Sequence, residues 1–158
     1  MRNSVERVLL FAIAISVLVL APLSAQASQC SNGTTAGKWA YTYVGTIFTP
    51  SGPLPAASVG HYQQDNAGNI KGSQARSVAG SSGLEDVSGS VIVNKDCTAT
   101  ATINVLVDGQ LQRTATLALV YDSNGNHARM IFQSLTLPDG TNIPVVLTID
   151  ANRIVSKD

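Results

Sequence analysis

The sequence contains little charge, and the charge it has is balanced. Ten basic and ten acidic side chains in 158 residues give a formal net charge of zero. A nucleic-acid-binding surface or a polybasic membrane patch requires clustered Lys and Arg, so we expect neither kind of partner. Beyond residue 27, no apolar run approaches the length of a membrane-spanning helix, and we expect no stable membrane insertion of that part.

The motifs of common catalytic and metal sites are also missing. The sequence has no G-x-S-x-G, no H-E-x-x-H and no phosphate-binding glycine loop. Its two histidines, His61 and His127, lie next to expected turns, where exposed or hydrogen-bonded imidazoles are common. The one acidic pair, Glu85-Asp86, follows a Gly/Ser loop and is interpreted as solvated. We therefore assign no catalytic residue, no metal ligand and no cofactor.

The first 27 residues have the three-part plan of a secretory signal peptide. Two arginines precede an apolar segment over residues 8–23, and Ala25-Gln26-Ala27 matches an A-x-A cleavage site. An uncleaved anchor is the alternative, but the segment is short for a membrane helix. The sequence thus predicts a signal peptide at 1–27, an N-terminal arm at 28–36 and a β-barrel domain at 37–158, exported to a periplasm or out of the cell.

Only two cysteines are present, Cys30 and Cys97. In an exported chain, two cysteines most simply form a disulfide. The alternative is a redox pair, but redox cysteines usually lie close together as C-x-x-C. We expect a structural bond that joins the N-terminal arm to a strand in the middle of the chain.

Turn-forming residues divide the remaining chain at nearly regular intervals. The segments between them are rich in Val, Ile, Thr and Tyr and often alternate in polarity, as strands do. No segment has a helical apolar stripe. Seven turns separate eight strands, so we expect an all-β, antiparallel up-and-down meander that closes into an eight-stranded barrel without free edges. The turns are at residues 49–53, 65–69, 79–83, 94–96, 108–109, 123–126 and 138–140.

Alternation within two neighbouring segments predicts their buried faces and their pairing. In both 97–107 and 111–121 the odd-numbered positions are mostly apolar, whereas Thr98, Thr100 and Thr102 alternate with them and are expected to face solvent or an association surface. A two-residue turn would pair Val107 with Gln110 and mix the two faces. We therefore predict a bulged turn of odd length that places Val105 opposite Leu111.

Two loops share the pattern D-x-x-G-N, at residues 65–69 and 122–126. In a tight turn, the Asp carboxylate accepts backbone hydrogen bonds and the Gly takes a left-handed conformation. A calcium loop would need more oxygen ligands and a distal Glu, which neither loop has. Both are interpreted as turns.

Aromatic residues are scarce: one Trp, four Tyr and three Phe. Trp39, Tyr41 and Tyr43 alternate along one segment and therefore point to the same face. Trp39 is expected in the core. A buried phenol needs a hydrogen-bond partner, so Tyr41 and Tyr43 either pack in the core or line a cavity, and Tyr121 is a further candidate for the cavity wall.

Gly37-Lys38-Trp39 at the start of this segment resembles the G-x-W signature of the calycin-type barrels, the lipocalins and avidins. The resemblance implies an eight-stranded barrel closed at one end by Trp39. It also implies that a basic residue of the last strand, here Arg153, packs over the Trp ring in a cation–π contact. The chain has a single Trp, whereas biotin pockets use several, so we infer no biotin site. Barrels similar to allene oxide cyclase or dirigent proteins fit the pattern equally.

The leading functional hypothesis is an exported barrel that binds a small apolar molecule or lipid in its interior. A filled barrel that acts as a structural or interaction protein is the first alternative, and a barrel enzyme of unknown reaction is the second. The presence of a cavity distinguishes the first two, because a binding barrel needs room that a filled barrel lacks. A buried polar cluster with shifted pKa values would favour the third. The sequence does not predict the oligomeric state.

Overall fold

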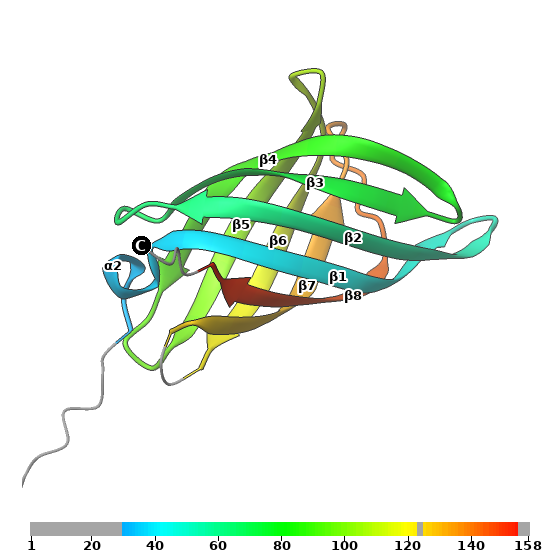
Figure 1. The fold of residues 1–158 in the computed structure, drawn as a ribbon. Helices are drawn as coiled ribbons and strands as arrows, with labels where there is room; N and C mark the ends of the chain where they lie inside the picture. Colours follow the sequence, from blue (N-terminus) through cyan, green and yellow to red (C-terminus); the bar gives the residue numbers. More distant parts are fainter. Residues whose placement is uncertain (1–29, 123–124, 155–158) are drawn as a thin grey trace, which may run out of the picture.

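The computed structural model describes residues 30–122 and 125–154, so the predicted signal peptide lies outside the described residues. Eight antiparallel strands form a closed barrel in which each strand pairs with the next and β8 pairs with β1 (Figure 1). The predicted all-β up-and-down barrel is confirmed. The strands are β1 (Gly37–Thr49), β2 (Gly52–Gln64), β3 (Asn69–Val78), β4 (Ser81–Val93), β5 (Thr98–Val107), β6 (Gln110–Tyr121), β7 (His127–Thr136) and β8 (Val145–Arg153).

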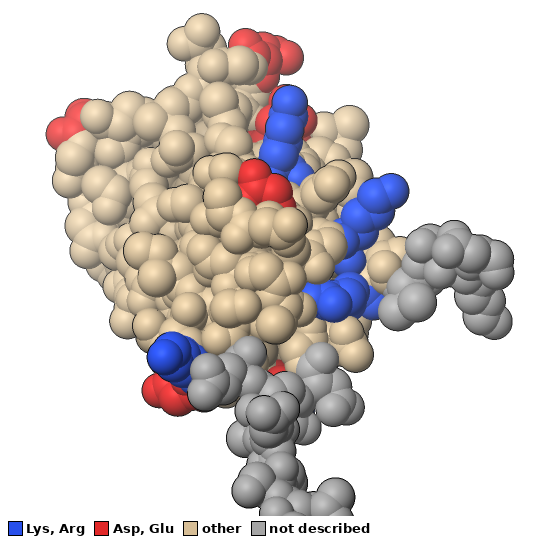
Figure 2. Space-filling model, turned by 90° about the vertical axis from the view of Figure 1, so that its left-hand side faces the viewer, with Lys and Arg blue, Asp and Glu red and all other residues tan. Residues whose placement is uncertain are grey.

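Alternating side chains build the core inside the barrel. On β5, Ala99, Ala101 and Val105 are buried, while Thr100 and Thr102 are exposed and Thr98 is half-buried. This is the two-residue period of a strand with one face on the core. The outer surface carries few charges, and the face seen in Figure 2 is mostly uncharged with scattered side chains of both signs.

The predicted pairing of β5 with β6 is wrong. Val107 pairs directly with Gln110 through a two-residue turn in which Asp108 and Gly109 both have positive φ, 50° and 75°. This is the turn geometry whose twist suits a two-residue hairpin. A bulge still brings the apolar faces of β5 and β6 to the same side of the sheet. It lies near the start of β6 and not in the turn.

The bulge leaves Gln112 without a partner. Leu106 pairs with Leu111, but Val105 pairs with Arg113, so Gln112 is the extra residue. A bulge restores the inward direction of the side chains that follow it. Beyond Gln112 the odd-numbered residues of β6 face the core as predicted, and the first of them is Arg113 rather than an apolar side chain.

One end of the barrel is covered by the N-terminal arm. A one-turn helix that the sequence did not predict, α2 (Asn32–Thr35), begins at a capping box made by Ser31 and Thr34. It lies against the end of the barrel where β1 starts (Figure 1). The side chain of Asn32 accepts a hydrogen bond from the Val93 amide (2.9 Å) and donates to the Ala67 carbonyl (3.0 Å), so the arm is tied to the end of β4 and to the loop between β2 and β3.

The disulfide between Cys30 and Cys97 secures the same end. The bond confirms the predicted pairing of the two cysteines. It places Cys30 next to the turn between β4 and β5. Within the described residues, no helix has the length and apolarity needed to cross a membrane.

Candidate ligand cavity

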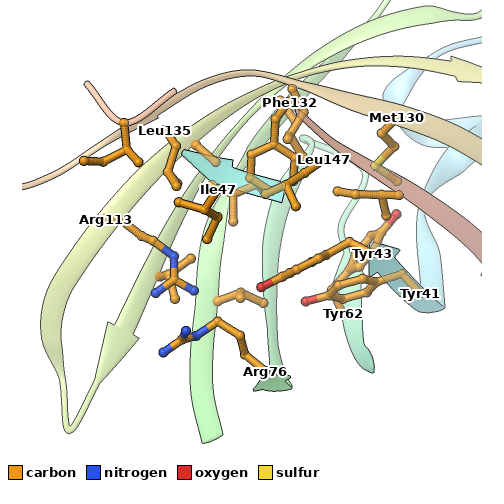
Figure 3. Close-up of a pocket in the computed structure, with 18 of the residues that line it drawn as sticks. Tyr41, Tyr43, Ile47, Tyr62, Arg76, Arg113, Met130, Phe132, Leu135 and Leu147 are labelled. Atoms are coloured by element: carbon orange, nitrogen blue, oxygen red, sulfur yellow. The ribbon is translucent and has the colours of Figure 1, made fainter. Parts of the chain in front are cut away.

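The barrel contains a cavity of about 320 Å³. Volumes of this size lie at the lower end of the range for small-molecule sites. Its wall is mostly apolar, with phenols toward the covered end and two guanidinium groups on one side (Figure 3). The lining residues are Tyr41, Tyr43, Ile47, Thr49, Tyr62, Ile70, Arg76, Val78, Val87, Ala101, Ile103, Val105, Arg113, Ala115, Leu117, Leu119, Tyr121, Met130, Phe132, Leu135, Leu137, Ile143, Leu147 and Ile149.

The lining residues also show where the cavity opens. Thr49, Val78 and Leu137 lie at or just beyond the ends of β1, β3 and β7, at the end of the barrel opposite α2. The cavity therefore runs from a floor near α2 toward the loops at the other end. A molecule that enters the barrel would enter between these loops.

Trp39 lies beneath the floor of the cavity, against two of the tyrosines that line it. Its side chain is fully buried, and its ring stacks on Tyr62 with centroids 6.1 Å apart and meets the edge of Tyr121 at 5.7 Å. The indole N–H donates to the Thr35 carbonyl of α2 at 3.1 Å. The single Trp thus joins the helical cap to the ring cluster beneath the cavity.

Arg153 lies over the Trp39 ring, with its guanidinium carbon 5.4 Å from the ring centroid. Its Nη2 also donates to the Thr34 carbonyl at 2.6 Å. A cation over an indole face is attracted by the ring quadrupole. The structure therefore brings together the two residues predicted to close the barrel, and places them against the end of α2.

The four tyrosines define the deep part of the cavity. Tyr41, Tyr43 and Tyr121, the predicted candidates, all line it, and Tyr62 joins them from β2. Burial raises the pKa of Tyr41, with the nearby Tyr43 and Glu85 adding to the rise. Burial also raises the pKa values of the phenols of Tyr43, Tyr62 and Tyr121. All four are therefore neutral at physiological pH.

A buried polar network begins at Tyr41. The Tyr41 hydroxyl donates to Gln74 Oε1 at 2.8 Å, and the Ser58 hydroxyl donates to the same oxygen at 3.1 Å. Gln74 Nε2 then donates to Glu85 Oε2 at 2.6 Å. Tyr41, Ser58 and Gln74 thus each have a hydrogen-bond partner in this network, which removes most of the cost of burying their polar groups.

Glu85 is the centre of the network, and the interpretation of this residue as solvated is wrong. Its side chain is 2% exposed. Arg113 donates to both oxygens, from Nη1 to Oε1 at 2.9 Å and from Nη2 to Oε2 at 2.5 Å, and Arg76 Nε donates to Oε1 at 2.7 Å. Its neighbour Asp86 is exposed, as expected.

The surroundings of Glu85 keep it ionised. Burial alone would raise the pKa of this carboxyl, but hydrogen bonds and charge from Arg113, together with Gln74 and Arg76, outweigh burial and hold the pKa below its usual value. A general base that works near neutral pH needs a pKa near that pH. Glu85 is therefore suited to positioning the two arginines rather than to accepting protons.

The two histidines and the 65–69 loop, to which the sequence assigns no site, lie outside the cavity. His61 is exposed on β2, and His127 Nε2 lies 2.8 Å from Asp150 Oδ2 on the outer face. In the 65–69 loop, Asp65 Oδ1 accepts from the amides of Ala67 (2.9 Å) and Asn69 (2.8 Å), so this loop is the predicted turn. The described residues contain no group of three or more His, Cys, Asp or Glu placed to hold a metal ion.

No protein-family model matches the chain, and no curated protein sequence matches it. Among solved structures, the chain is similar to the S-type phycobiliprotein lyase CPES from Guillardia theta. The TM-score is 0.42 and the identity 10%, over 78% of this chain and 90% of that one. We infer the function of this chain from its own cavity and not from this likeness.

The polar side of the cavity is the part that sequence reasoning missed. Gln74, Glu85, Arg76 and Arg113 come from three strands, and the contacts between them span up to 28 residues of sequence. The alternation of inward and outward positions along each strand did indicate that two of these residues face the interior. Arg113 has the parity of the apolar face of its own segment, and Glu85 has the parity of Val87 and Val91.

Proposed function

We propose that this protein is an exported binding protein that holds one small, largely apolar molecule in the barrel. The observation that carries the proposal is the cavity of about 320 Å³, lined mostly by aliphatic and aromatic side chains and closed at the Trp39 end. Burial of apolar surface is the main driving force for binding in such a site.

The cavity favours binding over the filled-barrel alternative. Ala101 and Ala115 line it at positions where larger side chains would occupy the space. Packed interiors seldom leave voids larger than a water molecule. An interior of this size therefore supports a function that uses the space. A buried polar cluster with shifted pKa values, the feature expected to favour a barrel enzyme, is present around Glu85. The direction of the Glu85 shift favours binding instead, since the one buried carboxylate among the described residues is held as an anion by its partners and is not suited to accept a proton near neutral pH.

Export is part of the proposal and rests on two observations. The N-terminal sequence has the signal-peptide pattern. The disulfide between Cys30 and Cys97 is of the kind that persists in oxidising compartments. Intact mass of the protein recovered from a secreting host tests this: a chain beginning at Ser28 supports export, and a full-length chain in the membrane fraction contradicts it.

A neutral fluorescent probe tests the binding function. N-phenyl-1-naphthylamine is apolar and uncharged, and its emission rises when it leaves water. We expect saturable binding to the wild-type protein. Ala101→Trp, which places an indole in the cavity, should abolish it without loss of thermal stability.

Thr102→Trp is the matched control. Thr102 lies on the same strand but is exposed on the outer face, so this variant should bind the probe as the wild type does. Equal probe binding by all three proteins would place the site outside the barrel and contradict the proposal.

A further inference from the structure

The cavity carries an uncompensated positive charge. Arg76 and Arg113 are the charged residues among those that line it in the described part of the chain. Both contact a single carboxylate, Glu85. The four phenols that face the cavity are neutral because burial raises their pKa values. Two guanidinium groups and one carboxylate leave a net charge of plus one in apolar surroundings.

Within the described residues, the terminal nitrogens of these two guanidinium groups that donate to no acceptor belong to Arg76. Arg113 uses both of its terminal nitrogens on Glu85. Arg76 uses only Nε on the same carboxylate, and within the described residues its two terminal nitrogens have no hydrogen-bond acceptor. The Arg76 side chain is 29% exposed, compared with 16% for Arg113, so it is the more accessible of the two. The two free nitrogens form the end-on fork that binds a carboxylate through two parallel hydrogen bonds.

Glu85 and the bulge in β6 position this fork. The extra residue Gln112 brings Arg113 into line with Val105, where it meets Glu85 from the side opposite Arg76. Figure 3 shows the guanidinium groups of Arg76 and Arg113 near each other on one side of the cavity. Arg113 and Gln74 hold the Glu85 carboxylate in place, and only Nε of Arg76 donates to it.

We propose that the bound molecule is an amphipathic monoanion whose carboxylate binds the terminal nitrogens of Arg76 while its apolar part lies among the deep residues of the cavity. This inference rests on the proposed binding function and specifies its ligand. A single negative charge matches the net charge of the Arg76–Glu85–Arg113 cluster. The aliphatic and aromatic side chains of the cavity wall accommodate a hydrocarbon chain or ring system.

Displacement of the neutral probe by a matched pair of compounds tests the proposal. Decanoate and 1-decanol share a chain and differ in the charged head group, and decylamine carries the opposite charge. We expect decanoate to displace the probe from the wild-type protein at a concentration about tenfold or more below that of 1-decanol, as a charge-assisted bidentate contact allows. Decylamine should be the weakest of the three.

Two substitutions locate the preference. Arg76→Met retains an unbranched side chain and removes the charge. The ratio of the 1-decanol to the decanoate concentration needed to displace the probe should therefore fall to about one, while 1-decanol binds as before. Arg76→Lys should retain part of the preference. Arg129→Met removes an exposed arginine of β7 and is the matched control. It should change the binding of neither compound.

The outcomes separate this inference from the function on which it rests. Failure of the neutral probe to bind the wild-type protein would overturn both. Probe binding with equal displacement by decanoate and 1-decanol would leave the binding function standing and overturn the anionic ligand. A decanoate preference that survives Arg76→Met would also overturn it. The wild-type comparison of the three compounds needs no substitution, so a poorly folded variant does not prevent a decision.

Discussion

Glu85 and Arg113 form a bidentate ion pair inside a mostly apolar barrel, with nitrogen–oxygen distances of 2.9 and 2.5 Å. The pair joins β4 to β6 across 28 residues of sequence. Arg76 adds a third member at 2.7 Å, and Gln74 connects the cluster to Tyr41. A cluster of this kind contributes little net stability when complete, but removal of one member leaves its partners buried and unpaired.

Glu85→Gln is therefore expected to destabilise the protein at neutral pH. The substitution leaves two neighbouring guanidinium groups without an anion. We expect a loss of about 2–3 kcal/mol, somewhat below the cost of breaking a fully buried pair, because Arg76 stays partly exposed. Urea unfolding at pH 7 measures the loss. Asp86→Asn, on the same strand but exposed, should change stability little, and equal effects of the two substitutions would contradict this account of the cluster.

Acid should weaken the wild-type protein through the same residue. The pKa of Glu85 is lower in the folded protein than its ordinary value of 4.5, so the folded state binds this proton less readily than the unfolded state. The stability due to Glu85 is then present above pH 4.5 and is lost as the pH falls below that value through the lowered pKa. Thermal unfolding from pH 7 to pH 3 should show this decline. In Glu85→Gln the decline should be smaller, and identical pH profiles would contradict the assignment.

Gly60 is expected to be intolerant of a side chain. A Cβ there would lie 2.7 Å from Tyr41 Cζ and 2.7 Å from the Ser73 carbonyl oxygen. Gly60→Ala should displace the Tyr41 ring and cost about 1–3 kcal/mol, the usual range for overpacking. Gly83→Ala is the control, since a Cβ at Gly83 meets nothing within 4 Å. Melting temperatures of the two variants measure the difference. Equal melting temperatures would contradict the close contact between Gly60 and Tyr41.

The disulfide should contribute strongly to stability. It closes a loop with a sequence separation of 67 residues, for which chain entropy gives about 4 kcal/mol. Cys30→Ser/Cys97→Ser should therefore unfold at a markedly lower denaturant concentration. Reductant should lower the midpoint of the wild-type protein to the same value and leave the double variant unchanged. A midpoint insensitive to both changes would show that the arm does not depend on this bond.

The contact between Arg153 and Trp39 should stabilise the covered end. Arg153→Met removes the cation over the indole and the hydrogen bond to the Thr34 carbonyl, so we expect a loss of about 1–2 kcal/mol. The near-ultraviolet circular dichroism of the single Trp reports directly on the same site. An unchanged Trp signal together with unchanged stability would argue against the contact.

The fold could be predicted because its signals are local. Turn residues and alternation lie within single strands, and closure of eight meander strands follows from the need to pair every edge. The G-x-W resemblance supplied the expected pairing of Trp39 with Arg153, although these residues are far apart in the sequence. The α2 helix is too short for a helical pattern to be visible, and its one turn is stabilised by the capping box and by contacts with the barrel.

The polar cluster could be predicted only in part. Alternation places Arg113 and Glu85 on inner faces, but a charged residue at an inner position is credible only when its partner is known. The partner depends on the register of β6 with β5, which the bulge at Gln112 changes. The two-residue turn at Asp108-Gly109 and the bulge both satisfy local rules, so the sequence alone did not distinguish a bulged turn from a tight turn followed by a bulge.

The central claim is that the barrel holds one small molecule in its interior, and native mass spectrometry tests it most directly. The wild-type protein and Ala101→Trp are recovered from the secreting host without denaturation, and both are saturated with decanoate. We predict a mass increment of one decanoate, or of one retained small molecule, on the wild-type protein, lost on denaturation and missing from Ala101→Trp. The same increment on both proteins, or none on either, would contradict a ligand held inside the barrel.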